Sequence, residues 1–100
     1  MDRVDFIESV NGIIYPEMIV NFFDHFIALK EIVQDSGKVN VISESSNKIS
    51  FSILFNNIEC MNKALSVISN GFIVIYGEQL RLDVEPVSTD LQIILHITKM

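Results

Sequence analysis

Apolar residues alternate with polar ones along three stretches of the chain, and this alternation predicts β-strands with one buried face. Apolar positions recur at every second residue between Ile49 and Phe55, between Leu80 and Val84, and between Leu91 and Ile97. Successive side chains of a strand point to opposite faces of its sheet, so a spacing of two collects the apolar ones on one face. The chain is therefore built on a sheet whose two faces differ in chemistry.

Three segments are expected to be helical. Residues 2–11 form a short helix, and a longer helix begins at Pro16, whose missing amide hydrogen would be unpaired at the first helical position in any case. Gly37 ends this helix in a left-handed conformation. Apolar side chains cover more than the usual third of its surface, so it has to be covered on two sides. A third helix takes Asn56 as its cap and ends before Gly71.

The first pair of strands is predicted to be a hairpin of residues 38–44 and 48–55. If Val39 and Val41 share the buried face with the apolar residues of the second strand, the parity requires a three-residue loop between the strands. Asn47, the last residue of that loop, is expected in the left-handed position that such loops need.

A second hairpin joins residues 72–76 to residues 79–85 through a two-residue turn that begins at Gly77, which suits type II′. This turn pairs Ile75 with Leu80 on the buried face. The opposite, outer face then carries too many apolar side chains for a freely solvated sheet, and we interpret it as an interaction surface. Its expected members are Phe72, Val74, Tyr76, Arg81, Asp83, Ile94 and His96.

These elements follow one another in the order (α)αββαβββ and predict an α+β fold of one domain, residues 1–100. We expect a two-layer sandwich with helices on one face of a mainly antiparallel sheet of about five strands. A circularly permuted ferredoxin-like arrangement accounts for four of them. The fifth strand does not fit that arrangement, because the strand at 79–85 would already be central and would have no free edge. The short connection between this strand and the last strand nevertheless predicts that the two are neighbours. The strand order stays open.

Composition adds that the surface is both acidic and unusually apolar. Thirteen acidic and seven basic residues give a net charge of −6, which disfavours binding to phosphate backbones and anionic membranes. The hydrophobic fraction is 49% and the mean hydropathy is +0.38, so part of the apolar surface is expected to meet another protein or a second copy. The single cysteine, Cys60, excludes an internal disulfide and favours a reducing, cytoplasmic location.

The sequence contains no arrangement that is typical of a catalytic, metal or cofactor site. His25 and His96 fall in different predicted elements. Asp24 precedes His25, but adjacent side chains on a helix diverge by about 100°. No nucleophile or carboxylate is fixed beside His96 by sequence. The glycines are isolated from one another, so no phosphate-binding loop is expected. Spacings for metal ligands are absent as well. We therefore expect a protein that is not an enzyme and holds no cofactor.

The profile of a small, acidic, cytoplasmic domain favours a non-catalytic protein-interaction module, such as a binding or inhibitor protein. Immunity proteins, secretion chaperones and phage-encoded inhibitors share its size and charge, but no motif of theirs is present. The alternative is a regulatory homodimer that encloses a small ligand between two open sheets. A weaker alternative is an acidic mimic of nucleic acid, which needs carboxylates arrayed along one face.

Overall fold

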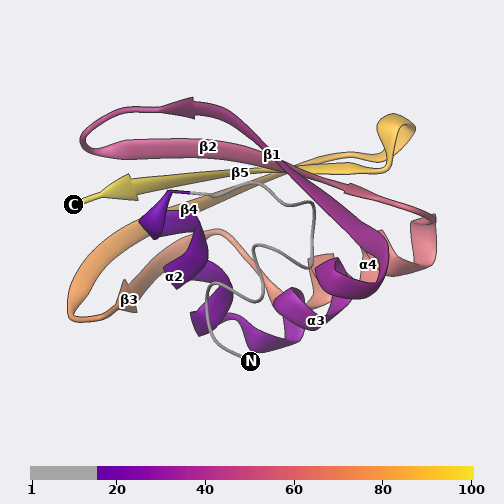
Figure 1. Cartoon of the computed structure of the whole chain (residues 1–100), viewed down its shortest axis with the longest axis horizontal. Helices are drawn as coiled ribbons and strands as arrows, with labels where there is room; N and C mark the ends of the chain where they lie inside the picture. The colour runs from indigo at the N-terminus through magenta and orange to yellow at the C-terminus, as the bar shows by residue number, and fades with distance from the viewer. Residues whose placement is uncertain (1–15) are drawn as a thin grey trace.

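The computed structural model describes residues 16–100, which form three helices and a five-stranded antiparallel sheet, with the helices on one face of the sheet (Figure 1). This arrangement confirms the predicted α+β sandwich. The helix expected over residues 2–11 lies outside the described residues. The elements are α2 (Glu17–His25), α3 (Ile27–Ser36), β1 (Gly37–Glu44), β2 (Lys48–Phe55), α4 (Ile58–Val67), β3 (Gly71–Ile75), β4 (Glu78–Val87), η1 (Ser88–Asp90) and β5 (Gln92–Lys99).

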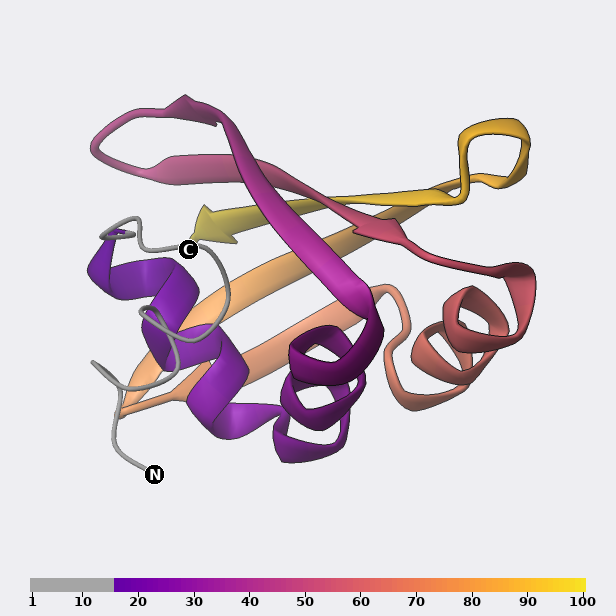
Figure 2. The same cartoon turned by 45° about the vertical axis from the view of Figure 1, so that its right-hand side comes forward.

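The strands lie side by side in the order β1-β2-β5-β4-β3, and all neighbours are antiparallel. The last strand is therefore central, and its pairing with β4 was expected from the short connection between them. In a four-stranded permuted ferredoxin-like sheet β2 and β4 would touch directly, whereas here β5 separates them. The two edges of the sheet are β1 and β3. Figure 2 shows β1 crossing in front of the other strands, which are strongly twisted relative to it.

The predicted alternation places the core correctly. Phe51 on β2 is fully buried, and its ring packs against Phe22 and Phe23 of α2, with ring centroids 5.7 and 5.9 Å apart. The same face of the sheet is completed by side chains of the central strands, which are all inaccessible to water: Ile49, Ile53, Leu82, Ile93, Leu95 and Ile97. One hydrophobic cluster thus fills the space between the helices and the sheet.

The expected long helix is two helices, because the chain breaks at Phe26 (φ −100°, ψ 72°). The Phe26 ring packs against Phe22 with centroids 4.8 Å apart. The expectation for Gly37 was also wrong: its backbone is extended (φ −128°, ψ 165°). A Cβ there would lie 3.1 Å from the Cα of Val33 and 3.2 Å from Ile53, so a larger residue would make these neighbours shift by a few tenths of an ångström.

The cap of α4 is Asn57 and not Asn56. The Asn57 side-chain oxygen accepts a hydrogen bond of 2.9 Å from the backbone N–H of Cys60. Asn56 instead donates its own backbone N–H to the Ser36 carbonyl, 3.0 Å away. The two asparagines are adjacent in sequence, and the earlier one is used to tie the loop to the end of α3, which moves the cap along by one residue.

The β1–β2 hairpin closes with a two-residue turn, because the Ser45 N–H donates to the Lys48 carbonyl at 2.8 Å. A register shift at Ile42, between Val41 and Ser43, restores the pairing that a three-residue loop would give, and Val41 lies opposite Phe51. Asn47 is not left-handed, since the non-glycine residues of positive φ among residues 16–100 are Tyr76 and Leu91. The register was therefore predicted correctly, but it is produced by the bulge and not by a three-residue loop. Val39 is buried as expected, whereas Val41 is 41% exposed.

The β3–β4 turn consists of Tyr76 and Gly77, with φ of 50° and 77°, which is the type I′ pattern and not the expected type II′. Ile75 consequently pairs with Glu78, and Ile73 pairs with Leu80. This register differs from the predicted one by two residues. Because side chains alternate with a period of two, the shift leaves the residues of β3 and β4 on their predicted faces, whereas Tyr76, expected in the first strand, lies in the turn.

Candidate functional site

The seven residues of the predicted interaction surface fall into three places. Phe72 and Val74 lie on the edge strand β3, with 62% and 58% of their surface exposed. The central strands β4 and β5 carry the polar members and Ile94 on the outer face, as predicted from their parity: Arg81, Asp83, Ile94 and His96. Tyr76 does not belong to the outer face of the sheet, because it lies in the turn and lines a pocket beside α2. The expectation that Tyr76 extends the outward row of β3 was therefore wrong.

A chain of hydrogen bonds crosses the centre of the outer face. The Ser50 hydroxyl lies 2.7 Å from His96 Nδ1, and His96 Nε2 lies 3.4 Å from a carboxylate oxygen of Glu85. Asp83 lies directly opposite His96 on the neighbouring strand and is paired with Arg81 at 3.4 Å. Sequence analysis singled out His96 but missed Ser50 and Glu85, although both have outward parity.

The order serine, histidine, carboxylate is that of a hydrolase relay, yet the geometry does not fit one. Ser50 is only 4% exposed, in the middle of a strand that is paired on both sides. An acyl substrate needs access to the hydroxyl and free N–H groups for its developing oxyanion. The backbone of β2 is engaged with β1 and β5, so the chain of hydrogen bonds orders the sheet face and does not present a nucleophile.

The edge strand β3 is a site of a different kind. Its five residues, Gly71–Ile75, include no charged residue and no proline. Ile75 and Glu78 flank a two-residue turn and form a hydrogen-bonded pair. Hydrogen-bonded and non-hydrogen-bonded pairs alternate along an antiparallel ladder, so Phe72 and Val74 belong to non-hydrogen-bonded pairs. The N–H and C=O groups of Phe72 and Val74 consequently point away from β4, toward the open edge.

The opposite edge of the sheet is protected by contrast. Strand β1 carries Lys38 and Glu44 near its two ends and is distorted by the register shift at Ile42. Charged side chains and bulges are the usual means by which proteins keep an edge strand from pairing with another chain. Strand β3 has neither, and its outward side chains are apolar. This contrast makes β3 the exceptional edge of the sheet.

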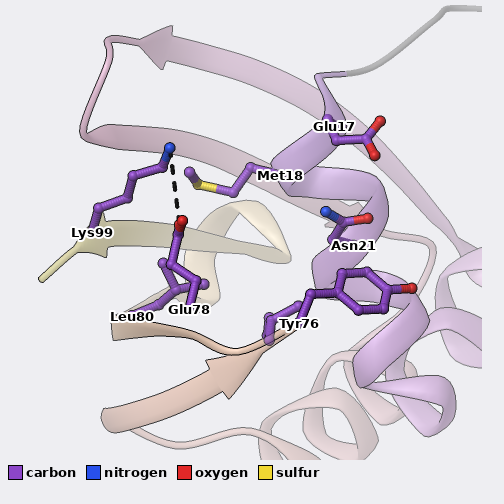
Figure 3. Close-up of a pocket in the computed structure, with 8 residues that line it drawn as sticks. Glu17, Met18, Asn21, Tyr76, Glu78, Leu80 and Lys99 are labelled. Atoms are coloured by element: carbon purple, nitrogen blue, oxygen red, sulfur yellow. Dashed lines mark ion pairs between the residues drawn. The ribbon is translucent and has the colours of Figure 1, made fainter.

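A pocket of about 220 Å³ opens between the first turns of α2 and the end of the sheet, where β3 turns into β4 (Figure 3). Lys99 and Glu78 form an ion pair across one side of it, with Nζ and Oε1 3.9 Å apart. The Asn21 side chain lines it from α2, and the oxygen Oδ1 of that amide is buried without a hydrogen-bond partner. The described residues that line it are Glu17, Met18, Asn21, Ile75, Tyr76, Glu78, Leu80 and Lys99. Sequence analysis did not anticipate this pocket, because its residues come from four separate elements.

Residues 16–100 contain no cluster of three or more histidine, cysteine, aspartate or glutamate side chains that could hold a metal ion. Cys60, half-buried in the first turn of α4, packs against the hydrophobic core. Within the described part of the chain, no helix combines the length and the apolar character that crossing a bilayer requires.

Comparison with known proteins identifies no relative of the chain. No protein-family model matches the chain, no curated protein matches it, and no solved structure matches its fold. The function therefore has to be argued from the edge strand, the outer face and the pocket themselves.

Proposed function

We propose that the protein is a non-catalytic protein-interaction module that binds an extended segment of another protein by strand addition to β3. The observation that carries this proposal is the unprotected edge: five residues without charge or proline, with Phe72 and Val74 largely exposed. A strand added there would pair with the outward backbone groups of these two residues and cover their side chains. Main-chain hydrogen bonds supply affinity in this mode, and the side chains supply specificity.

The chemistry of β3 indicates the chemistry of its partner. Side chains of an added strand would alternate between the outer face, beside Phe72 and Val74, and the helix side, beside Ile73. The partner segment should therefore carry apolar residues at every second position. With a net charge of −6, the domain attracts a basic segment and repels a second acidic copy of itself. We accordingly favour another protein over self-association.

The polar side chains of the outer face form the rim of this binding site. Arg81 lies directly opposite Phe72, and it is held by Asp83 on the same strand. A partner segment on β3 would have some of its side chains on the outer face of the sheet, on the same face as Arg81. Rim charges of this kind change the rate of association and its salt dependence more than they change affinity. The single cysteine supports a location in the reducing cytoplasm.

The test uses a substitution that removes one backbone donor and no bond within the sheet. The Val74 N–H points to the open edge, so Val74→Pro leaves the pairing of β3 with β4 intact, as proline is tolerated on the solvent side of an edge strand. Peptides of about twelve residues, selected from a displayed random library against the wild-type protein, should lose binding to Val74→Pro. The matched control is Ile42→Pro on the opposite edge, where a residue of similar exposure lies in an already irregular strand.

Three results would separate the possible outcomes. Selected peptides with alternating apolar residues that bind the control but not Val74→Pro support strand addition at β3. Peptides that bind both variants equally place the site elsewhere and overturn the proposal. A protein that forms a dimer in light scattering, and a monomer as Val74→Pro, would show that the edge is occupied by a second copy, against the charge argument.

A further inference from the structure

We propose that the pocket at the open end of the sandwich binds a small zwitterion with an aliphatic chain, namely a free α-amino acid such as leucine or methionine. The pocket lies between α2 and the ends of β3, β4 and β5 (Figure 3). It shares no residue with the outward backbone groups of β3, so this proposal does not depend on the protein partner.

Opposite charges at the mouth of the pocket match the two charges of an amino acid. Figure 3 shows Glu78 and Lys99 pointing toward each other from neighbouring strands, and their charged atoms are 3.9 Å apart, at the long limit of an ion pair. Both side chains are about half exposed, so their mutual attraction is weakened by water. A carboxylate beside Lys99 and an ammonium group beside Glu78 would complete four alternating charges.

The floor of the pocket is apolar and continuous with the core. Met18 of α2 faces Leu80 of β4 and Ile75 of β3 across it. The aliphatic side chain of the ligand would rest on these three residues and leave water. Its charged head group would stay at the mouth of the pocket. The volume of about 220 Å³ lies below the range of about 300–1,000 Å³ that is typical of drug-sized ligands. This volume suits a molecule of the size of a single amino acid.

The Asn21 amide gives an independent indication that a ligand belongs here. Its oxygen is buried and has no hydrogen-bond partner, which is uncommon for buried polar atoms in folded proteins. Rotation of the amide about its last torsion turns either the N–H donors or the oxygen toward the pocket, so it can serve the carboxylate or the ammonium group. With the oxygen turned toward the pocket, the ammonium group of a bound amino acid would give this oxygen the partner that the described part of the chain does not supply.

The test is a titration of the full chain with L-leucine, followed by calorimetry and by thermal unfolding. Leucine at ten times its dissociation constant should raise the unfolding midpoint by about 6–11 °C, given the usual size of this effect for a domain of this length. Two analogues that each lack one charge, isoamylamine and 4-methylpentanoate, should bind at least ten times more weakly. Lys99→Met and Glu78→Gln should each weaken leucine binding by a similar factor.

The controls make each outcome decisive. Lys48→Met makes the same substitution on β2, outside the pocket lining, and should bind leucine as the wild type does. Val74→Pro should also keep leucine binding, so failure of the edge-strand proposal would leave this one standing. Absence of saturable binding by leucine and methionine up to their solubility limits would overturn the proposal. Equal binding of leucine and isoamylamine would overturn it too, because Lys99 would then recognise nothing.

Discussion

Truncation of the two exposed side chains of β3 should weaken partner binding by an amount that follows from their exposure. Full burial of a valine or phenylalanine side chain stabilises by about 1.5–3 kcal/mol. Phe72 and Val74 retain 62% and 58% of their surface in water, so a partner strand that covered both would gain about 2–3.5 kcal/mol. Alanine keeps the Cβ atom, and Phe72→Ala with Val74→Ala should therefore raise the dissociation constant about 10- to 150-fold.

The assay is fluorescence anisotropy of a labelled peptide selected on the wild-type domain, titrated with the double variant. Stability should change little, since both side chains are on the surface, and urea unfolding checks this directly. Ile42→Ala on the opposite edge is the matched control, because that side chain is 54% exposed. A dissociation constant that rises less than threefold in the double variant, or that rises equally in the control, would refute the reasoning from β3.

Three further substitutions test the local structure. Gly77→Ala should destabilise the fold by about 1–2 kcal/mol in urea unfolding, since φ is 77°; an unchanged midpoint would contradict the type I′ turn. Asn57→Ala should cost about 1 kcal/mol through loss of the cap, whereas Asn56→Ala should change stability by less than about 0.5 kcal/mol; the reverse ranking would restore Asn56 as the cap. His96→Ala should cost about 1–3 kcal/mol by leaving the Ser50 hydroxyl buried without its partner, and adding Ser50→Ala should recover most of that loss; additive costs would show that the two residues act separately.

The fold was predictable because its dominant signal is periodic. Alternating apolar residues assigned Phe51, Leu82 and Leu95 to the buried face before any pairing was known, and all three are inaccessible to water. The faces of the second hairpin also survived a register error, because the error was an even number of residues. Phe72 and Val74 were identified as exposed apolar residues on the same grounds.

Local devices and long-range contacts were not predictable in the same way. Nothing in the residues around Phe26 marks a helix break, because they include neither glycine nor proline and the apolar spacing continues through them. Tyr76 was misplaced because an outward parity holds only while the strand continues, and here a positive φ ends it. The contact between Ser50 and His96 joins residues that are 46 positions apart, and it depends on the pairing of β2 with β5.

The most direct test of strand addition at β3 is amide hydrogen exchange measured residue by residue, with and without a selected peptide. The account predicts fast exchange of the Phe72 and Val74 amides in the free domain, because both point to the open edge. Saturating peptide should slow these two amides and leave the Ile73 amide, already bonded to β4, nearly unchanged. Protection that appears elsewhere while Phe72 and Val74 still exchange freely would contradict the central claim.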